Sequence, residues 1–225
     1  MRKHLEKRAP LRFILAIFLG LVIAGTVVTA EIFRLDKELL KRLEVKCGKE
    51  ALVRTVAWET LIQQDKSTSD GERLEKANHF FNSRIRFISD IELWGVEDYW
   101  ATPLEFLCKG AGDCEDFAIA KYFTLRTMGM PDEKLNITYV KALQYNVHHM
   151  VLTYYSEPGA EPLVLDNLID SINPASKRTD LMPIFSFNGT GLWTAKQRGQ
   201  GSGAGSSSRI KSWQGVMQKM SEDKL

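Results

Sequence analysis

The chain has 225 residues, of which 44% are hydrophobic and 26% are charged, and its formal net charge is +2. This length and composition are typical of one globular domain with or without appendages. The near-neutral charge, without a basic stripe interleaved with aromatic residues, argues against a nucleic-acid-binding protein.

The first thirty residues predict an export signal. MRKHLEKRAPLR carries five Lys or Arg, FILAIFLGLVIAG is an uninterrupted apolar run, and VVTA ends in small residues. This pattern predicts a signal peptide over residues 1–30, cleaved after Ala30. An uncleaved anchor is the alternative, because the run from Phe13 to Ala30 just reaches the roughly 18 residues that a spanning helix needs. Either way, we expect the rest of the chain to lie on the far side of the membrane.

The three cysteines follow this segment at Cys47, Cys108 and Cys114. An odd number in an exported protein indicates at least one free thiol. A Cys47–Cys108 bridge is one arrangement, and two unpaired structural thiols fit the sequence at least as well.

The N-terminal half has helical periodicity. Leucines recur every fourth residue, so we predict helix over residues 32–64, with a break at Cys47-Gly48, and a further helix around residues 74–81. Residues 82–103 have a mixed, aromatic-rich pattern that predicts an irregular, packed connection. The strongest helix prediction covers residues 114–128, because glycines and the potential N-cap Asp113 precede it and GMP ends it.

Strand patterns follow at residues 136–143, 148–155 and 161–168, each β-branched or aromatic and bounded by turns. Helices followed by adjacent strands predict an α+β fold, with an N-terminal helical lobe and a mostly antiparallel sheet over residues 31–196. In residues 197–225, a Gly/Ser-rich tract predicts a flexible segment, and the end of the chain predicts a short docked helix.

The cysteine at the start of the predicted 114–128 helix is a candidate nucleophile. Free N–H groups at a helix N-terminus favour a thiolate. Two histidines, His148 and His149, lie on a predicted strand, and Asp166 ends the next strand. Only one of two neighbouring histidines can face Cys114, because strand side chains alternate. The order Cys, His, Asp is that of papain-like chemistry, although each residue alone also fits an ordinary structural role.

Three acids, Asp113, Glu115 and Asp116, surround Cys114. Their charge should raise the pKa of the thiol and oppose its ionisation. Acids in a first helical turn are usually solvated caps, but a bound Ca²⁺ would explain so many carboxylates beside a nucleophile. Asp98 is a candidate for a further oxygen ligand.

The blocks DYWATPLEFL, GAGDCEDFAIAKYFTLRTMG, HHMVLTYY and PLVLDNL closely resemble the bacterial transglutaminase-like cysteine proteinases, the LapG family, over roughly residues 74–193. The resemblance implies a papain-like, transglutaminase-like fold in which Cys114 is the nucleophile, His149 the base and Asp166 the orienting acid. His149 is preferred to His148 because the family histidine directly precedes the MVL strand. Asp113, Glu115 and Asp116 match the family's calcium-binding acids.

The same resemblance implies a periplasmic, calcium-dependent endoprotease. Its implied substrate is a large cell-surface adhesin, cut near the adhesin's N-terminus at a di-alanine site to release the cell from a biofilm. Its implied inhibitory partner is an inner-membrane cyclic-di-GMP receptor of the LapD type. A narrow cleft walled by Trp94 or Trp100 would suit two alanines. Transglutaminase-type acyl transfer to an amine, or a non-catalytic, calcium-stabilised binding module, are the alternative functions.

Overall fold

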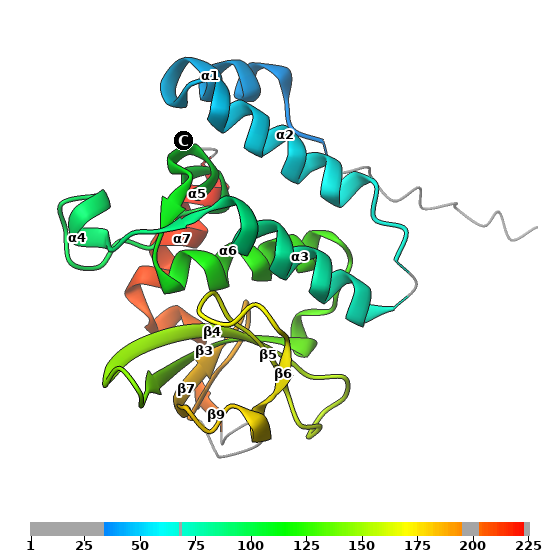
Figure 1. Ribbon diagram of the computed structural model, residues 1–225, viewed down its shortest axis with the longest axis vertical. Helices are drawn as coiled ribbons and strands as arrows, with labels where there is room; N and C mark the ends of the chain where they lie inside the picture. The colour runs from blue at the N-terminus through cyan, green and yellow to red at the C-terminus, as the bar shows by residue number, and fades with distance from the viewer. Residues whose placement is uncertain (1–33, 68, 195–202, 223–225) are drawn as a thin grey trace, which may run out of the picture. The chain divides into compact units, whose positions relative to one another are not determined.

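The computed structural model describes residues 34–67, 69–194 and 203–222. Helices cover one face of an antiparallel sheet (Figure 1), so the predicted α+β class is confirmed. The helices are α1 (Lys37–Cys47), α2 (Lys49–Gln63), α3 (Asp70–Arg84), α4 (Asp90–Leu93), α5 (Pro103–Lys109), α6 (Cys114–Thr127) and α7 (Lys211–Ser221). None of the helices in these ranges is long and apolar enough to cross a membrane. The predicted export segment lies outside the described residues.

The seven-stranded sheet has the order β6-β5-β4-β3-β7-β8-β9, and each pair of neighbouring strands in it is antiparallel. Its strands are β3 (Leu135–Ala142), β4 (Val147–Tyr154), β5 (Leu163–Leu165), β6 (Asn173–Pro174), β7 (Leu181–Phe187), β8 (Leu192–Thr194) and β9 (Gly203–Gly205). The three predicted strands are present as β3, β4 and β5, although β5 is shorter than expected. Strands β6 to β9 were not predicted.

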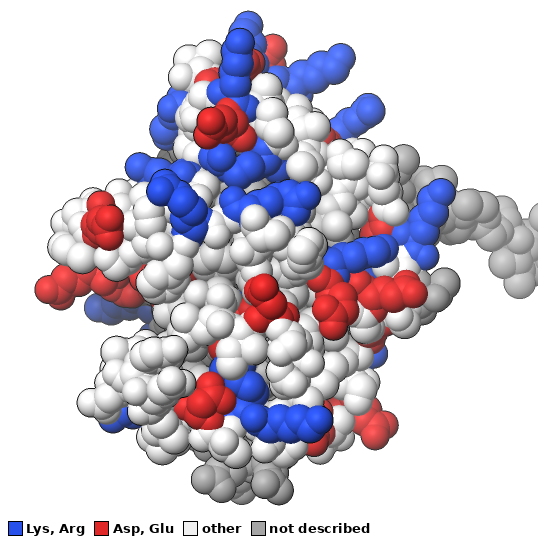
Figure 2. Space-filling view, viewed as in Figure 1, with Lys and Arg blue, Asp and Glu red and all other residues white. Residues whose placement is uncertain are grey.

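Helices α1 and α2 form a hairpin at the predicted break. Gly48 has φ 86°, a left-handed value that favours glycine, and it ends α1 immediately before α2 begins. A disulfide joins Cys47 to Cys108 in α5, with the two Cα atoms 5.3 Å apart. The bridge resolves the cysteine alternatives and leaves Cys114 as the free thiol. Basic side chains gather over the α1–α2 end of the face shown in Figure 2.

Helix α6 lies at the centre of the core, and ten of its residues are buried. It packs on β4 and α3, where Phe117, Ile119 and Leu125 are 3% exposed or less. Full burial of each such side chain contributes about 1.5–3 kcal/mol to folding. Packing along its whole length therefore anchors α6 between the sheet and α3.

A second, two-stranded sheet positions the chain just before α6. Strand β1 (Arg86–Phe87) pairs in parallel with β2 (Ala111–Gly112), and Ile88 N–H donates to the carbonyl of Gly112 at 2.9 Å. This pairing brings the short helix α4 beside the start of α6, although the two are more than twenty residues apart in the sequence. Residues 82–103 are otherwise largely irregular, as predicted.

The C-terminal residues that the structure describes belong to the same unit as the rest of residues 32–225. Gly203–Gly205 pairs with β8, so this part of the Gly/Ser-rich tract is an edge strand and not the flexible segment that its composition predicts. Helix α7 is present and docked, with Trp213 and Val216 buried.

Candidate active site

Cys114 is the first residue of α6, where the free N–H groups of the first turn are concentrated. Its sulfur donates a hydrogen bond to Glu115 Oε2 at 3.0 Å. Burial raises the pKa of this thiol, and a backbone hydrogen bond from Met150 on β4 lowers the pKa by a smaller amount. The structure thus brings the thiol to strand β4 beside His149, but within the described residues the thiol makes no hydrogen bond to that histidine. Catalytic hydrogen bonds are often formed only once substrate is bound.

The two neighbouring histidines have different environments. His149 is 4% exposed, and its Nε2 lies 2.8 Å from Asp166 Oδ1. His148 is exposed, and its ring stacks on Tyr139 with centroids 5.1 Å apart. Because β4 and β5 are antiparallel neighbours, a histidine near the start of β4 meets an aspartate just after the end of β5. The sequence-based pairing of His149 with Asp166 is present in the structure.

Asp166 is buried and held by an extensive set of donors. Its carboxylate accepts hydrogen bonds from Leu168 N–H (3.0 Å) and Arg178 Nη2 (2.7 Å), in addition to His149. Burial opposes its charge, but the hydrogen bonds from His149, Leu168 and Arg178 hold the pKa of Asp166 below its usual range. Arg178, 4% exposed, also pairs with Asp180 at 2.8 Å. The sequence carries no signal for Arg178, since only the fold brings it to Asp166.

Five carboxylates meet beside the thiol, and we call them the acidic cluster: Asp90, Asp98, Asp113, Glu115 and Asp116. One ligand oxygen from each of Asp90, Asp113 and Asp116 lies within 4.8 Å of the other two, and the same holds for Asp90, Asp98 and Glu115. The three predicted acids are therefore together, and Asp98, suggested by the sequence, joins them. Asp90 was missed because only the β1–β2 pairing places it there.

Buried oxygens of this cluster lack partners in the described structure. Asp90 Oδ1, Asp113 Oδ1 and Asp116 Oδ2 are buried and accept no hydrogen bond. Asp113 occupies the N-cap position of α6 but makes no side-chain capping bond, so it does not serve the ordinary role of an acid there. Unpaired buried carboxylate oxygens are costly unless a cation binds them, and clustered oxygen ligands suit Ca²⁺. The residues fit the predicted calcium site.

The direction of the pKa shifts of Cys114 and its neighbouring acids agrees with a bound cation. Burial, followed by the negative charges of Glu115 and Asp113, raises the pKa of the Cys114 thiol well above its ordinary value. Burial likewise raises the pKa values of Asp113, Glu115 and Asp116. Without positive charge in the cluster, a reactive thiolate would therefore be strongly disfavoured.

The aromatic residues proposed to wall a cleft differ in exposure. Trp100 is 9% exposed, stacks on Phe187 with ring centroids 5.7 Å apart, and donates from Nε1 to Asp98. Most of its ring is thus packed into the core, with one part exposed. Trp94 is half-buried and packs on Tyr99 with centroids 4.2 Å apart.

Comparison with known proteins identifies the family of the chain. The model of the bacterial transglutaminase-like cysteine proteinase family, BTLCP, matches residues 46–193. The solved structure of Legionella pneumophila LapG is 41% identical, with a TM-score of 0.71, and the match covers 81% of this chain and 96% of that one. Its calcium-bound form matches at 42% identity and a TM-score of 0.70, covering 81% and 98%. The EGTA-treated form matches at 42% identity and a TM-score of 0.72, covering 81% and 96%. Among curated protein sequences, none matches the chain.

The match contains the free thiol, the His149–Asp166 pair and all five acids of the acidic cluster. It also covers the helices α2 to α6 and the sheet from β3 to the first two residues of β8. The chain belongs to the bacterial transglutaminase-like cysteine proteinases and is a LapG-type cysteine peptidase with the fold of that family.

Proposed function

We propose that this protein is a calcium-dependent cysteine endoprotease with Cys114 as nucleophile, His149 as general acid and base, and Asp166 as the residue that orients the imidazole. The observation that carries the proposal is the buried His149–Asp166 hydrogen bond, on a strand whose next residue contacts the free thiol. An imidazole fixed by a carboxylate beside a cysteine at a helix start is the arrangement that nucleophilic catalysis needs.

The chemistry is acyl transfer to water. His149 takes the proton of the Cys114 thiol, the sulfur attacks the scissile carbonyl carbon, the C–N bond breaks, and His149 gives that proton to the leaving amine. A water molecule then attacks the thioester carbonyl while His149 accepts a proton from the water. The C–S bond breaks, the acid product leaves, and the proton on His149 returns to the sulfur and restores the thiol. The Cys114 backbone N–H at the start of α6 is placed to donate to the oxyanion.

Calcium is the cofactor that the acidic cluster fits. Asp113, Glu115 and Asp116, together with Asp90 and Asp98, would hold the ion through their carboxylate oxygens. When bound, the ion supplies positive charge beside the thiol. The calcium-bound LapG from Legionella pneumophila, 42% identical, supports this assignment.

We further propose that the protein acts in the periplasm on a large surface adhesin, cutting near its N-terminus at a di-alanine site and so controlling biofilm release. In this account an inner-membrane cyclic-di-GMP receptor of the LapD type sequesters the protease. These proposals rest on the family resemblance, and the Cys47–Cys108 disulfide supports an oxidising compartment.

The neighbouring histidines allow a matched test of the catalytic assignment. An N-terminal adhesin fragment is incubated in calcium with the wild type, Cys114→Ala, His149→Ala and His148→Ala, and product termini are identified by mass spectrometry. We expect cutting between two alanines by the wild type and His148→Ala, and loss of cutting in the other two variants. Cutting by His149→Ala but not by His148→Ala would overturn the assignment.

The same assay separates the alternative functions. Addition of a labelled amine with a glutamine-containing substrate detects acyl transfer, and label incorporation without cutting would indicate a transglutaminase. Retention of biological function by Cys114→Ala would indicate a binding module, because both enzyme mechanisms need the thiol.

A further inference from the structure

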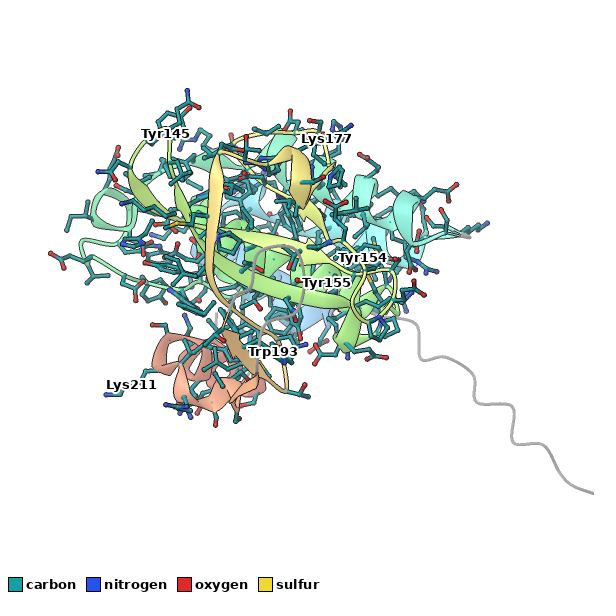
Figure 3. All side chains as sticks on the ribbon, turned by 90° about the horizontal axis from the view of Figure 1, so that it is seen from below. Tyr145, Tyr154, Tyr155, Lys177, Trp193 and Lys211 are labelled. Atoms are coloured by element: carbon teal, nitrogen blue, oxygen red, sulfur yellow. A yellow bond between two sulfur atoms is a disulfide. The ribbon has the colours of Figure 1, made fainter. Side chains whose placement is uncertain are left out.

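The C-terminal helix α7 lies beyond the residues that the family model matches, yet it is packed into the catalytic unit. Trp213 is 2% exposed and stacks on Phe123 of α6 with ring centroids 5.6 Å apart. It also meets Tyr122 and Phe187 edge-on. Figure 3 shows α7 beside the strand that carries Trp193, with Lys211 pointing away from the fold. This anchoring fixes the position of the remaining α7 side chains.

Two polar residues of α7 reach the segment that follows α4. Ser212 Oγ donates to Asp98 Oδ2 at 3.1 Å. Lys219 Nζ donates to the carbonyl of Trp100 and to Glu105 Oε2, both at 2.8 Å. The lysine nitrogen also lies 4.1 Å from the centroid of the Tyr99 ring. Helix α7 therefore holds residues 98–105, which include the connection from α4 and the first turn of α5.

The same segment supplies contacts to the acidic cluster. Asp98 belongs to it, and the N–H of Ala101 donates to Asp116 Oδ1 at 2.8 Å. The two Asp98 oxygens accept from Trp100 Nε1, at 2.9 Å, and from Ser212. Each carboxylate oxygen has a second lone pair for a metal ion, so these donors orient Asp98 without blocking it. Hydrogen-bond partners of this kind fix the direction in which a ligand presents its oxygen, and their loss commonly weakens metal binding 10- to 100-fold.

We propose that α7 is part of the calcium site, with Ser212 and Lys219 as positioning residues that hold Asp98 and the chain from residue 98 to 101 in the ligating arrangement. The site is then built from three separate parts of the chain: the α4 segment, the start of α6 and the C-terminal helix. This inference rests on the proposed calcium site, and it adds residues that neither the family match nor the acid pattern includes.

The test is calcium titration of the full-length protein by calorimetry, after removal of calcium with a chelator. The variants are Ser212→Ala and Lys219→Met, and Lys211→Met is the matched control. Lys211 is on the same helix, is exposed and points away from the fold. Lys211→Met therefore removes one positive charge from α7, as Lys219→Met does, but leaves the contacts of α7 to residues 98–105 in place. We expect the calcium Kd to rise about 10-fold or more in Ser212→Ala and Lys219→Met and to stay within twofold in the control.

Thermal unfolding in chelator shows whether each variant is folded before calcium is added. If Lys219→Met does not fold, Ser212→Ala decides the question, because its hydroxyl lies at the surface. Tight calcium binding by the wild type with an unchanged Kd in Ser212→Ala would overturn the role of α7 and leave the proposed calcium site intact. Absence of calcium binding by the wild type would overturn both.

Discussion

Gly112, two residues before the nucleophile, is packed so closely that a single added methyl group should disturb the acidic cluster. A Cβ atom at this position would lie 2.3 Å from Asp116 Oδ2 and 2.6 Å from the Phe106 ring. Its φ is not in the left-handed region, so alanine is acceptable to the backbone and the conflict is one of space alone. Phe106 is fully buried and Asp116 is 1% exposed, so neither can move away easily.

We therefore expect Gly112→Ala to lower the free energy of unfolding by about 1–3 kcal/mol, as overpacked core substitutions do. It should also weaken calcium binding, because the displaced oxygen belongs to a proposed ligand. Gly71→Ala is the control: a Cβ there meets nothing within 4 Å, and the helical position should gain up to about 1 kcal/mol. Urea unfolding and calcium titration measure both effects. A Gly112→Ala protein as stable as the wild type would refute the packing argument.

Three further predictions concern stability. Replacing Cys47 and Cys108 by alanine should cost about 4 kcal/mol in urea unfolding, because the bridge spans a sequence separation of 61, and an unchanged midpoint would contradict this. Burial lowers the pKa of Lys121 to about 7 in the folded protein. Above about pH 7 this lysine therefore binds more protons in the unfolded chain than in the folded protein, so the free energy of unfolding rises with pH, by up to about 1.4 kcal/mol per pH unit. In Lys121→Met this rise in the free energy of unfolding with pH should be absent. If urea unfolding gives the same rise for the wild type and Lys121→Met between about pH 7 and 9, the lysine is not its source. Arg178→Met should cost about 3–5 kcal/mol of stability and most of the activity, because Asp166 keeps its buried charge without the arginine that pairs with it at 2.7 Å. If Arg178→Met is as stable in urea and as active a peptidase as the wild type, the Arg178–Asp166 pair is dispensable.

Local sequence patterns predicted the elements that carry the site. The helix starting at Cys114 was predicted from its glycines and spacing, and strand alternation showed that only one of His148 and His149 could face a given partner. Helix α5 was missed although its signal is local: Thr102 and Glu105 form a capping box with Pro103 between them.

The remaining features depend on contacts between distant segments. The β1–β2 pair brings Asp90 to Asp113, and the fold of the sheet brings Arg178 to Asp166. Periodicity and spacing describe neighbours along the chain, so they give no indication of such pairs. The same limit left the Cys47–Cys108 bridge undecided until the structure placed α1 against α5.

The most direct test of the account is cleavage of an adhesin N-terminal fragment by residues 31–225, with excess calcium and with a chelator, beside Cys114→Ala. The account predicts cutting in calcium, little or none in chelator, recovery when calcium is restored, and none by the variant under any condition. Cutting that is equally fast in chelator would contradict the role given to the acidic cluster, and cutting by Cys114→Ala would contradict the thiol mechanism itself.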